Sequence, residues 1–188
     1  MDPETDEMCA AQAQRGDRNA FGVLVDRYQA KLHRYGKKFL SAQEDVEDIV
    51  QDVFVSAYKN IQSFDLSQRF SPWIYRIAHN AFVDGLKKKT RSPFIVMDFD
   101  TLISHGVSDE SVENEREQKE MKAMIDKGLD QLSQKYREIL ILYYLEDLSY
   151  KEIADVLRVP IGTVSARVKR AKEDLADVYK KMNIEHGI

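Results

Sequence analysis

This chain has few of the residues that would indicate several common classes of protein. Its one cysteine, Cys9, permits no internal disulfide, which fits a reducing cytoplasm. No apolar run approaches the roughly 20 residues that a membrane span needs. The opening stretch, MDPETDEMC, has neither a basic start nor an apolar core, so no secretion signal is expected. The sequence therefore predicts a cytoplasmic protein that is not itself a membrane protein.

Histidine is also scarce, and the four histidines are scattered along the chain. There is no His-x-x-x-His pair, no cysteine pair and no glycine-rich phosphate loop. The sequence thus predicts no metal, no cofactor and no catalytic residue. A net charge of −4 argues weakly against nucleic-acid binding, but the distribution of charge matters more than its sum.

Apolar residues recur at helical spacing almost throughout, which predicts an all-α fold. Gly16-Asp17 is expected to form a turn and cap before the helix that starts near Phe21. Ser71-Pro72 is expected to open a later helix, with serine as its N-cap. Met121, Met124, Ile125, Leu129 and Leu132 are predicted to mark the first helix of a second helical region.

Residues 92–118 have a different composition, with seven acids and one base. Their first half carries Pro, Gly and Ser and has no clear period, as in a linker. We predict two helical domains, 1–91 and 116–188, joined by an acidic linker over 92–115. The apolar patch at 94–99 is expected to pack on a surface, and a short strand is the alternative.

The stretch 44–54, EDVEDIVQDVF, places five carboxylates within nine positions. Val46, Ile49, Val50 and Val53 form an apolar stripe, whereas the acids fall on other faces of the same predicted helix. The acids alone permit three interpretations: a metal site, a docking surface for a basic partner, or a solvated helix face.

Residues 149–178 have the pattern of a helix-turn-helix. Ser149 and Glu152 predict a capping box at the first helix, VPIG a turn, and Thr163 the cap of the second helix. Gly162 to Lys172 contains four bases and no acid. Such a helix fits the major groove of DNA. The alternative is an αα-corner with solvated lysines.

Aromatic and basic residues are interleaved from 64 to 91. Aromatic rings beside cations suit unstacked nucleobases, each stacked base contributing about 1–3 kcal/mol. Alternatively, the rings belong to the core and the lysines match the dipole at a helix end. The cluster comprises Phe64, Phe70, Trp73 and Tyr75 with Arg69, Arg76 and His79, and it ends in Lys87, Lys88, Lys89 and Arg91.

In this order, four segments resemble bacterial RNA polymerase sigma factors of the extracytoplasmic function (ECF) type. They are AQRGDRNAFGVLVDRYQAKLHRY, EDVEDIVQDVFVSAYKNIQSF, FSPWIYRIAHNAFVDGLKKK and LSQKYREILILYYLEDLSYKEIADVLRVPIGTVSARVKRAKEDL. The resemblance implies an alternative sigma factor that binds core RNA polymerase and directs promoter recognition and transcription initiation. It also implies an anti-sigma partner, often tethered to a membrane.

Carried over residue by residue, the resemblance implies three sites. The polymerase clamp helices would meet Asp45, Glu47, Asp48, Gln51, Asp52 and Phe54. The melted −10 element would meet Phe64, Phe70, Trp73, Arg76, His79, Asn80, Lys87 and Lys88. The −35 duplex would meet Thr163, Ser165, Ala166, Arg167, Lys169 and Arg170. Family members often carry a base and a small hydroxyl residue after Gly-Thr-Val, where this chain has Ser165-Ala166.

Two rival functions remain open at this point. A helix-turn-helix regulator that is not a polymerase subunit would explain residues 149–178, but it leaves the Trp73 cluster and the acidic helix without a role. An enzyme would use EDVED as the aspartate-rich metal motif of helical prenyltransferases. That class needs a large apolar cavity and a second acidic cluster on a facing helix. The sequence contains no second acidic cluster of comparable density on a long apolar helix, so we expect no enzyme.

Overall fold

The computed structural model describes residues 4–40, 42–90 and 128–181, and every regular element in these ranges is helical. The chain divides into two compact units, Met1–Ile95 and Val96–Ile188, which are described separately below. The linker, its apolar patch at 94–99 and the start of the predicted helix at 121–132 lie outside the described residues. Among the described helices, none is long and apolar enough to cross a membrane.

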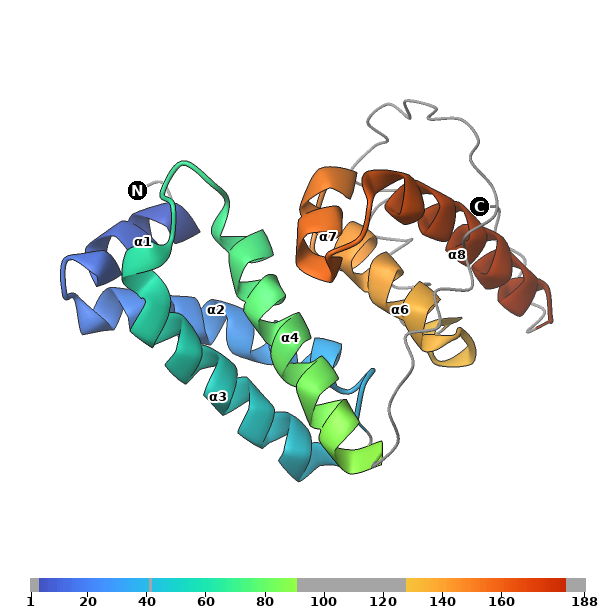
Figure 1. The fold of residues 1–188 in the computed structure, drawn as a ribbon, viewed down its shortest axis with the longest axis horizontal. Helices are drawn as coiled ribbons and strands as arrows, with labels where there is room; N and C mark the ends of the chain where they lie inside the picture. Colours follow the sequence, from blue (N-terminus) through green and yellow to red (C-terminus); the bar gives the residue numbers. More distant parts are fainter. Residues whose placement is uncertain (1–3, 41, 91–127, 182–188) are drawn as a thin grey trace. The chain divides into compact units, whose positions relative to one another are not determined.

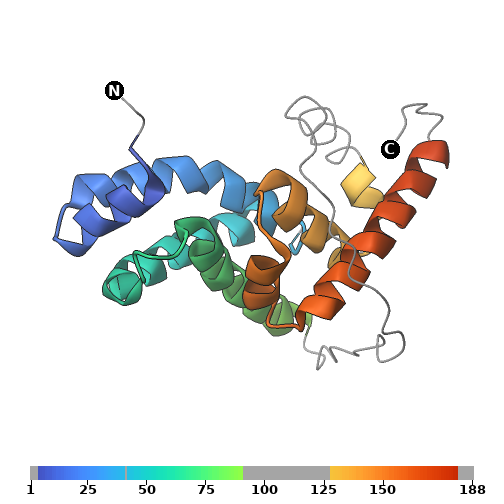
Figure 2. The same cartoon turned by 90° about the horizontal axis from the view of Figure 1, so that it is seen from above.

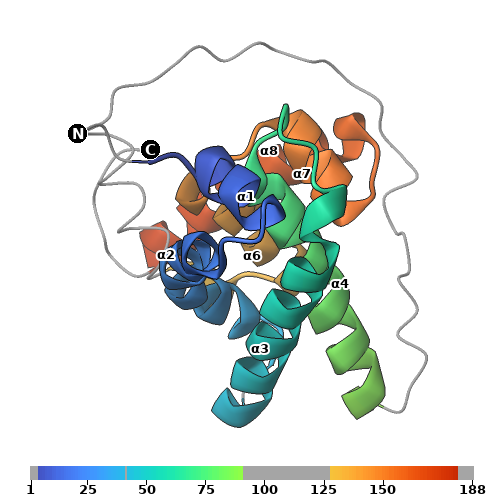
Figure 3. The same cartoon turned by 90° about the vertical axis from the view of Figure 1, so that its left-hand side faces the viewer.

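The first unit contains four helices and a 3-10 turn: α1 (Asp6–Gln14), α2 (Arg18–Gly36), α3 (Gln43–Asn60), η1 (Ile61–Ser63) and α4 (Phe70–Thr90). Helix α1 packs on α2, and α3 packs on both α2 and α4 (Figures 1 and 3). Gly16, with a φ of +98°, makes the turn before α2. Asp17 accepts hydrogen bonds from Asn19 and Ala20 and caps that helix, as predicted.

The core of the first unit follows the predicted stripes. Val46, Val50 and Val53 of α3 are fully buried, whereas Ile49 is only half-buried at the edge of the stripe. Burial of these side chains removes apolar surface from water and supplies most of the driving force for packing the helices. Cys9 is buried between α1 and its neighbours, and this burial, together with the nearby Glu4 carboxylate, raises the pKa of its thiol.

The predicted cap of α4 is wrong. The helix begins at Phe70, so Ser71 is a buried residue of its first turn and not the N-cap. The carboxylate of Glu7 in α1 instead accepts a hydrogen bond from the backbone N–H of Phe70, at 3.0 Å. A free N–H at a helix start is satisfied here by a residue that is distant in sequence.

The second unit contains η2 (Leu129–Gln131), α6 (Gln134–Leu140), a single π turn η3 (Ile141–Leu145), α7 (Tyr150–Leu157) and α8 (Ile161–Lys181). Helix α8 packs on both α6 and α7 (Figure 2). The capping box of Ser149 and Glu152 is present, with the Ser149 N–H donating to Glu152 at 2.7 Å. Local sequence was sufficient here because both partners lie within one helical turn.

The connection between α7 and α8 is shorter than predicted. Arg158 adopts a left-handed conformation with a φ of 55°, and α8 begins at Ile161. The backbone N–H of Thr163 donates to the carbonyl of Pro160 at 2.9 Å. Thr163 therefore lies inside the first turn of α8 and is not its cap, which corrects the prediction. The turn comprises Arg158, Val159 and Pro160.

Candidate functional sites

Helix α8 has one buried face and one outward face, as its sequence pattern predicts. Val164, Val168 and Leu175 are buried against α6 and α7. The outward face contains the six residues that the resemblance assigned to the −35 duplex. Ala166 and Lys169 are exposed, and Thr163, Ser165, Arg167 and Arg170 are half-buried beside them.

This outward face has the geometry of a groove-binding helix. Gly162 and Ala166 are small and exposed, so a partner surface can approach the first two turns of α8 closely. Lys169 projects a cation one turn farther along. Lys172 is different, because its ammonium lies 5.6 Å from the ring centres of both Tyr143 and Tyr144. Those cation–π contacts assign Lys172 to the packing of the unit and not to the outward face.

The predicted strand-binding aromatics do not all lie on the surface. Phe64 is 4% exposed and Phe70 is 1% exposed, and their rings pack together in a T-shaped pair. Neither ring has a free face for a nucleobase, so for these two residues the core interpretation is correct. Trp73 is half-buried and covers both phenylalanines, with ring centres 5.2 and 5.5 Å away.

Most of the remaining predicted residues of α4 face outward, and one of them contacts the core. At 100° per residue, Trp73, Arg76, Asn80 and Lys87 fall within an arc of about 60° along the helix. Arg76 and Lys87 are exposed, as is Lys88 farther around the helix. His79 lies on another side, where its Nδ1 is 3.3 Å from the Tyr35 hydroxyl. We call Trp73, Arg76, Asn80 and Lys87 the α4 row.

The loop that precedes α4 has a fixed base and an exposed tip. Asp65 accepts hydrogen bonds from the Ser67 N–H and hydroxyl, at 2.9 and 2.8 Å, and these bonds lower the pKa of its carboxyl. Leu66 is 43% exposed at the tip. At the base, the side-chain amide of Gln14 donates to the carbonyls of Ile61 and Phe64. No local sequence pattern indicates the role of Gln14, because its partners are 47 and 50 residues away.

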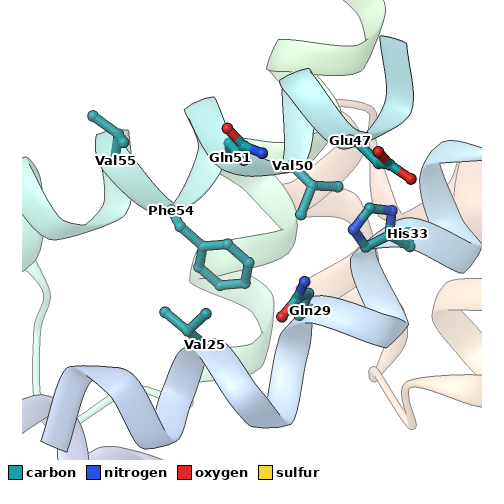
Figure 4. Close-up of a pocket in the computed structure, with 8 residues that line it drawn as sticks. All are labelled: Val25, Gln29, His33, Glu47, Val50, Gln51, Phe54 and Val55. Carbon is teal, nitrogen blue, oxygen red and sulfur yellow. The ribbon is translucent and has the colours of Figure 1, made fainter. Parts of the chain in front are cut away.

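The six predicted docking residues of α3 occupy two neighbouring faces. Asp48 and Asp52 are exposed, and the half-buried Asp45 lies on the same side; these three form the acidic ridge. The other three, Glu47, Gln51 and Phe54, line an open groove of about 460 Å³ against α2. Figure 4 shows Phe54 above Val25 at one end of this groove and Glu47 beside His33 at the other.

The groove is lined by both apolar and polar side chains. Val25, Val50 and Phe54 supply apolar surface, and Gln29 and Gln51 supply amides that both donate and accept hydrogen bonds. Such a surface suits another helix better than a metal ion. Within residues 4–40, 42–90 and 128–181, no three His, Cys, Asp or Glu side chains are grouped where they could hold a metal.

Comparison with known proteins relates these sites to a family. Residues 24–92 match the family described as Sigma-70 region 2, and residues 122–175 match Sigma-70, region 4. The chain is 36% identical over 172 residues to the ECF RNA polymerase sigma factor SigW of Bacillus subtilis, covering 87% of this chain and 91% of that protein. It is 33% identical to the ECF RNA polymerase sigma-E factor of Escherichia coli K12, covering 90% and 91%.

Solved structures agree with this relationship. The matching chain in the structure of CnrH in complex with the cytosolic domain of CnrY is 28% identical, with a TM-score of 0.64, over 94% of this chain and 97% of that one. The sigma factor RpoE of Bartonella quintana, solved with the anti-sigma factor NepR, is 25% identical, with a TM-score of 0.61, over 85% and 96%.

The comparisons decide between the three functions that the sequence left open. The matches extend over both units and include the acidic α3, which a regulator with only a helix-turn-helix would not explain. The curated relatives are named as ECF RNA polymerase sigma factors. The chain belongs to the ECF RNA polymerase sigma factors, which direct core RNA polymerase to promoters for transcription initiation.

Proposed function

We propose that the two units of this sigma factor have different roles. Residues 1–91 dock core polymerase and hold the −10 element, and residues 116–188 recognise the −35 element. Residues 92–115 form the linker between them. The separation of charge supports this division. The acidic ridge on α3 faces outward in one unit, and the basic outward face of α8 lies in the other. It is a cytoplasmic protein, as its partners require.

Helix α3 docks the core enzyme through the ridge and the groove together. The carboxylates of Asp48 and Asp52 attract a basic partner surface, and the groove at Phe54 accepts an apolar side chain from it. The two features act differently on binding. Exposed charges mainly raise the rate of association with the partner and its specificity, whereas buried apolar contact supplies affinity. The single observation that carries the docking proposal is this adjacency of exposed acids and an apolar groove on one helix.

The α4 row and the loop tip hold one melted strand. Arg76 and Lys87 provide cations for phosphates, and Asn80 provides an amide that can pair with a base edge. Trp73 is the one aromatic residue of the row, with part of its ring accessible. Phe64 and Phe70 support Trp73 from beneath and do not contact the strand.

Helix α8 reads the −35 duplex. Lys169 and Arg170 contact phosphates or base edges, and the methyl group of Ala166 can contact a thymine methyl, although it can donate no hydrogen bond. The free protein is expected to bind promoters weakly, because its basic faces are small and its net charge is −4. Strong and specific binding then requires the core enzyme.

An anti-sigma factor is the expected regulatory partner. One related structure is of CnrH in complex with the cytosolic domain of CnrY, and another is of the sigma factor RpoE in complex with the anti-sigma factor NepR. A protein that covers the docking groove of α3 would keep this chain from polymerase by competition.

The decisive experiment is transcription from a genomic promoter library with purified core polymerase from the same organism. The holoenzyme should select a set of promoters that share two elements, and the core enzyme alone should select none. Tight, sequence-specific binding by the isolated full chain at physiological salt would contradict the proposal.

A further inference from the structure

Helix α1 is joined to the base of the exposed loop by an unusual set of hydrogen bonds. The side-chain amide of Gln14 donates to the backbone carbonyls of Ile61 and Phe64, each at 2.8 Å. The side chain of Gln62 donates in return to the carbonyl of Gln14, at 2.6 Å. Both amide hydrogens of Gln14 are therefore used, and only a side chain with two donors in this position can make the pair.

The far end of the same loop is held by the same helix. Glu7 lies two helical turns before Gln14, and its carboxylate accepts the hydrogen bond from the Phe70 N–H. Helix α1 is itself fixed to α2, because Asp6 accepts hydrogen bonds from Arg27 and from the Tyr28 hydroxyl, each at 2.6 Å. The two ends of the loop thus share one rigid support.

Between these attachment points the chain changes from buried to exposed. Phe64 and Phe70, at the two ends, are buried, whereas all five residues from Asp65 to Arg69 are exposed. The loop is therefore exposed between two ends that are both held by α1. A loop held in this way loses less conformational entropy when it binds a ligand, and it binds more tightly as a result.

We propose that Glu7 and Gln14, the α1 anchor, position loop 65–69 for capture of the melted promoter strand. Gln14 acts as a positioning residue: it contacts no DNA and determines where the loop tip stands relative to the α4 row. This inference rests on the proposed function, in which the loop and α4 hold that strand. It assigns to α1 a part in promoter opening, in addition to packing.

The test compares Gln14→Leu with a matched control, Gln12→Leu. Both residues are half-buried glutamines of α1, but the amide of Gln12 donates to Glu4, at 2.5 Å, and not to the loop. The first measurement is backbone hydrogen exchange over residues 61–70 in the free, full-length protein. The second is affinity of the holoenzyme for a single-stranded oligonucleotide that carries the −10 element of the strongest promoter from the transcription library.

Gln14→Leu should accelerate exchange at the loop and weaken oligonucleotide affinity by roughly tenfold, since two neutral hydrogen bonds are lost. Its affinity for core polymerase should equal that of the wild-type protein, which a general loss of structure would not allow. Gln12→Leu should match the wild type in all three measurements. Equal behaviour of the two variants, or unchanged exchange in Gln14→Leu, would overturn the inference.

The isosteric variant Gln14→Glu separates hydrogen bonding from packing. It keeps the shape of the side chain but presents acceptors to two carbonyl oxygens, so its loop should be at least as exchange-labile as that of Gln14→Leu. Wild-type exchange in Gln14→Glu would overturn the role of the amide. Failure of the proposed function is visible separately, because the wild-type holoenzyme would then retain no oligonucleotide at all.

Discussion

Gly36, the last residue of α2, lies directly against the ring of Phe82 in α4. A Cβ at this position would overlap that ring and would stand 2.8 Å from a methyl group of Val46. The backbone of α2 can approach α4 this closely only because residue 36 has no side chain. The contact fixes the spacing of the two helices at the end of the unit where the aromatic cluster of Tyr35, Phe39 and Phe82 lies.

Gly36→Ala should therefore destabilise the first unit by about 1–3 kcal/mol, the usual cost of overpacking a core. Gly22→Ala is the matched control, because Gly22 lies within the same helix with nothing within 4 Å of its Cβ position. That change should stabilise the unit by about 0.5–1 kcal/mol through helix propensity. Urea unfolding followed by the fluorescence of Trp73, the one tryptophan of the chain, measures both. Equal effects of the two changes would contradict the close contact.

The acidic ridge gives a prediction about polymerase binding. Reversing both charges, with Asp48→Lys and Asp52→Lys, should weaken core polymerase binding by on the order of a hundredfold or more, since like charges at an interface cost several kcal/mol. The thermal unfolding of the protein should change little, because both side chains are exposed.

The control for the ridge is a double change of equal charge in the other unit. Glu173→Lys and Asp174→Lys alter two exposed acids of α8 and should leave the affinity for core polymerase unchanged. Binding measured by fluorescence anisotropy with labelled core enzyme distinguishes the two. A similar loss in both variants would indicate a general effect of charge and not a docking site.

Lys169 gives a prediction about the −35 element. Lys169→Ala should weaken holoenzyme binding to promoter DNA by about 1–3 kcal/mol if the ammonium contacts a base edge. If it contacts a phosphate, the loss should be similar at all promoters, and the dependence of log affinity on log salt should fall by about one. Lys180→Ala, near the other end of α8 where Lys180 pairs with Asp177 at 3.3 Å, should change neither quantity. Unchanged transcription at every promoter would remove Lys169 from the site.

Tyr179 gives a prediction about pH. Burial raises the pKa of its phenol to about 12, and a hydrogen bond with the Gly128 backbone opposes that shift in part. The unfolded chain loses this proton near pH 10, before the folded chain does, so stability is complete below pH 10 and falls as the pH rises toward 12. In Tyr179→Phe, unfolding of the second unit followed by circular dichroism should show a smaller decline across this window. An identical decline in both proteins would contradict the assignment.

The sequence predicted those features whose partners are close along the chain. The capping box at Ser149 and Glu152 and the buried stripe of Val164 and Val168 depend on helical periodicity alone, and the structure confirms them. The resemblance to sigma factors, based on the order of four motifs, is confirmed by the comparisons. The exposed acids of α3 likewise follow from their spacing.

The errors concern features that depend on tertiary contact. Ser71 and Thr163 have the residue types that favour N-caps, but α4 begins one residue before Ser71 and α8 begins two residues before Thr163. A side chain from α1 caps α4 instead. Phe64 and Phe70 lie beside basic residues in the sequence, yet both are buried, and their rings pack against each other and against Trp73. The role of Gln14 has no local signal at all.

Cys9 makes the protein a convenient host for spectroscopic labels. Its thiol is inaccessible in the folded state, and its raised pKa leaves little of the reactive thiolate. A cysteine introduced at Ser67 would then be the one thiol that reacts readily with a maleimide dye. The distance from that dye to a second one on the promoter strand would report the approach of the loop to DNA during opening, in a chain that needs no prior removal of native cysteines.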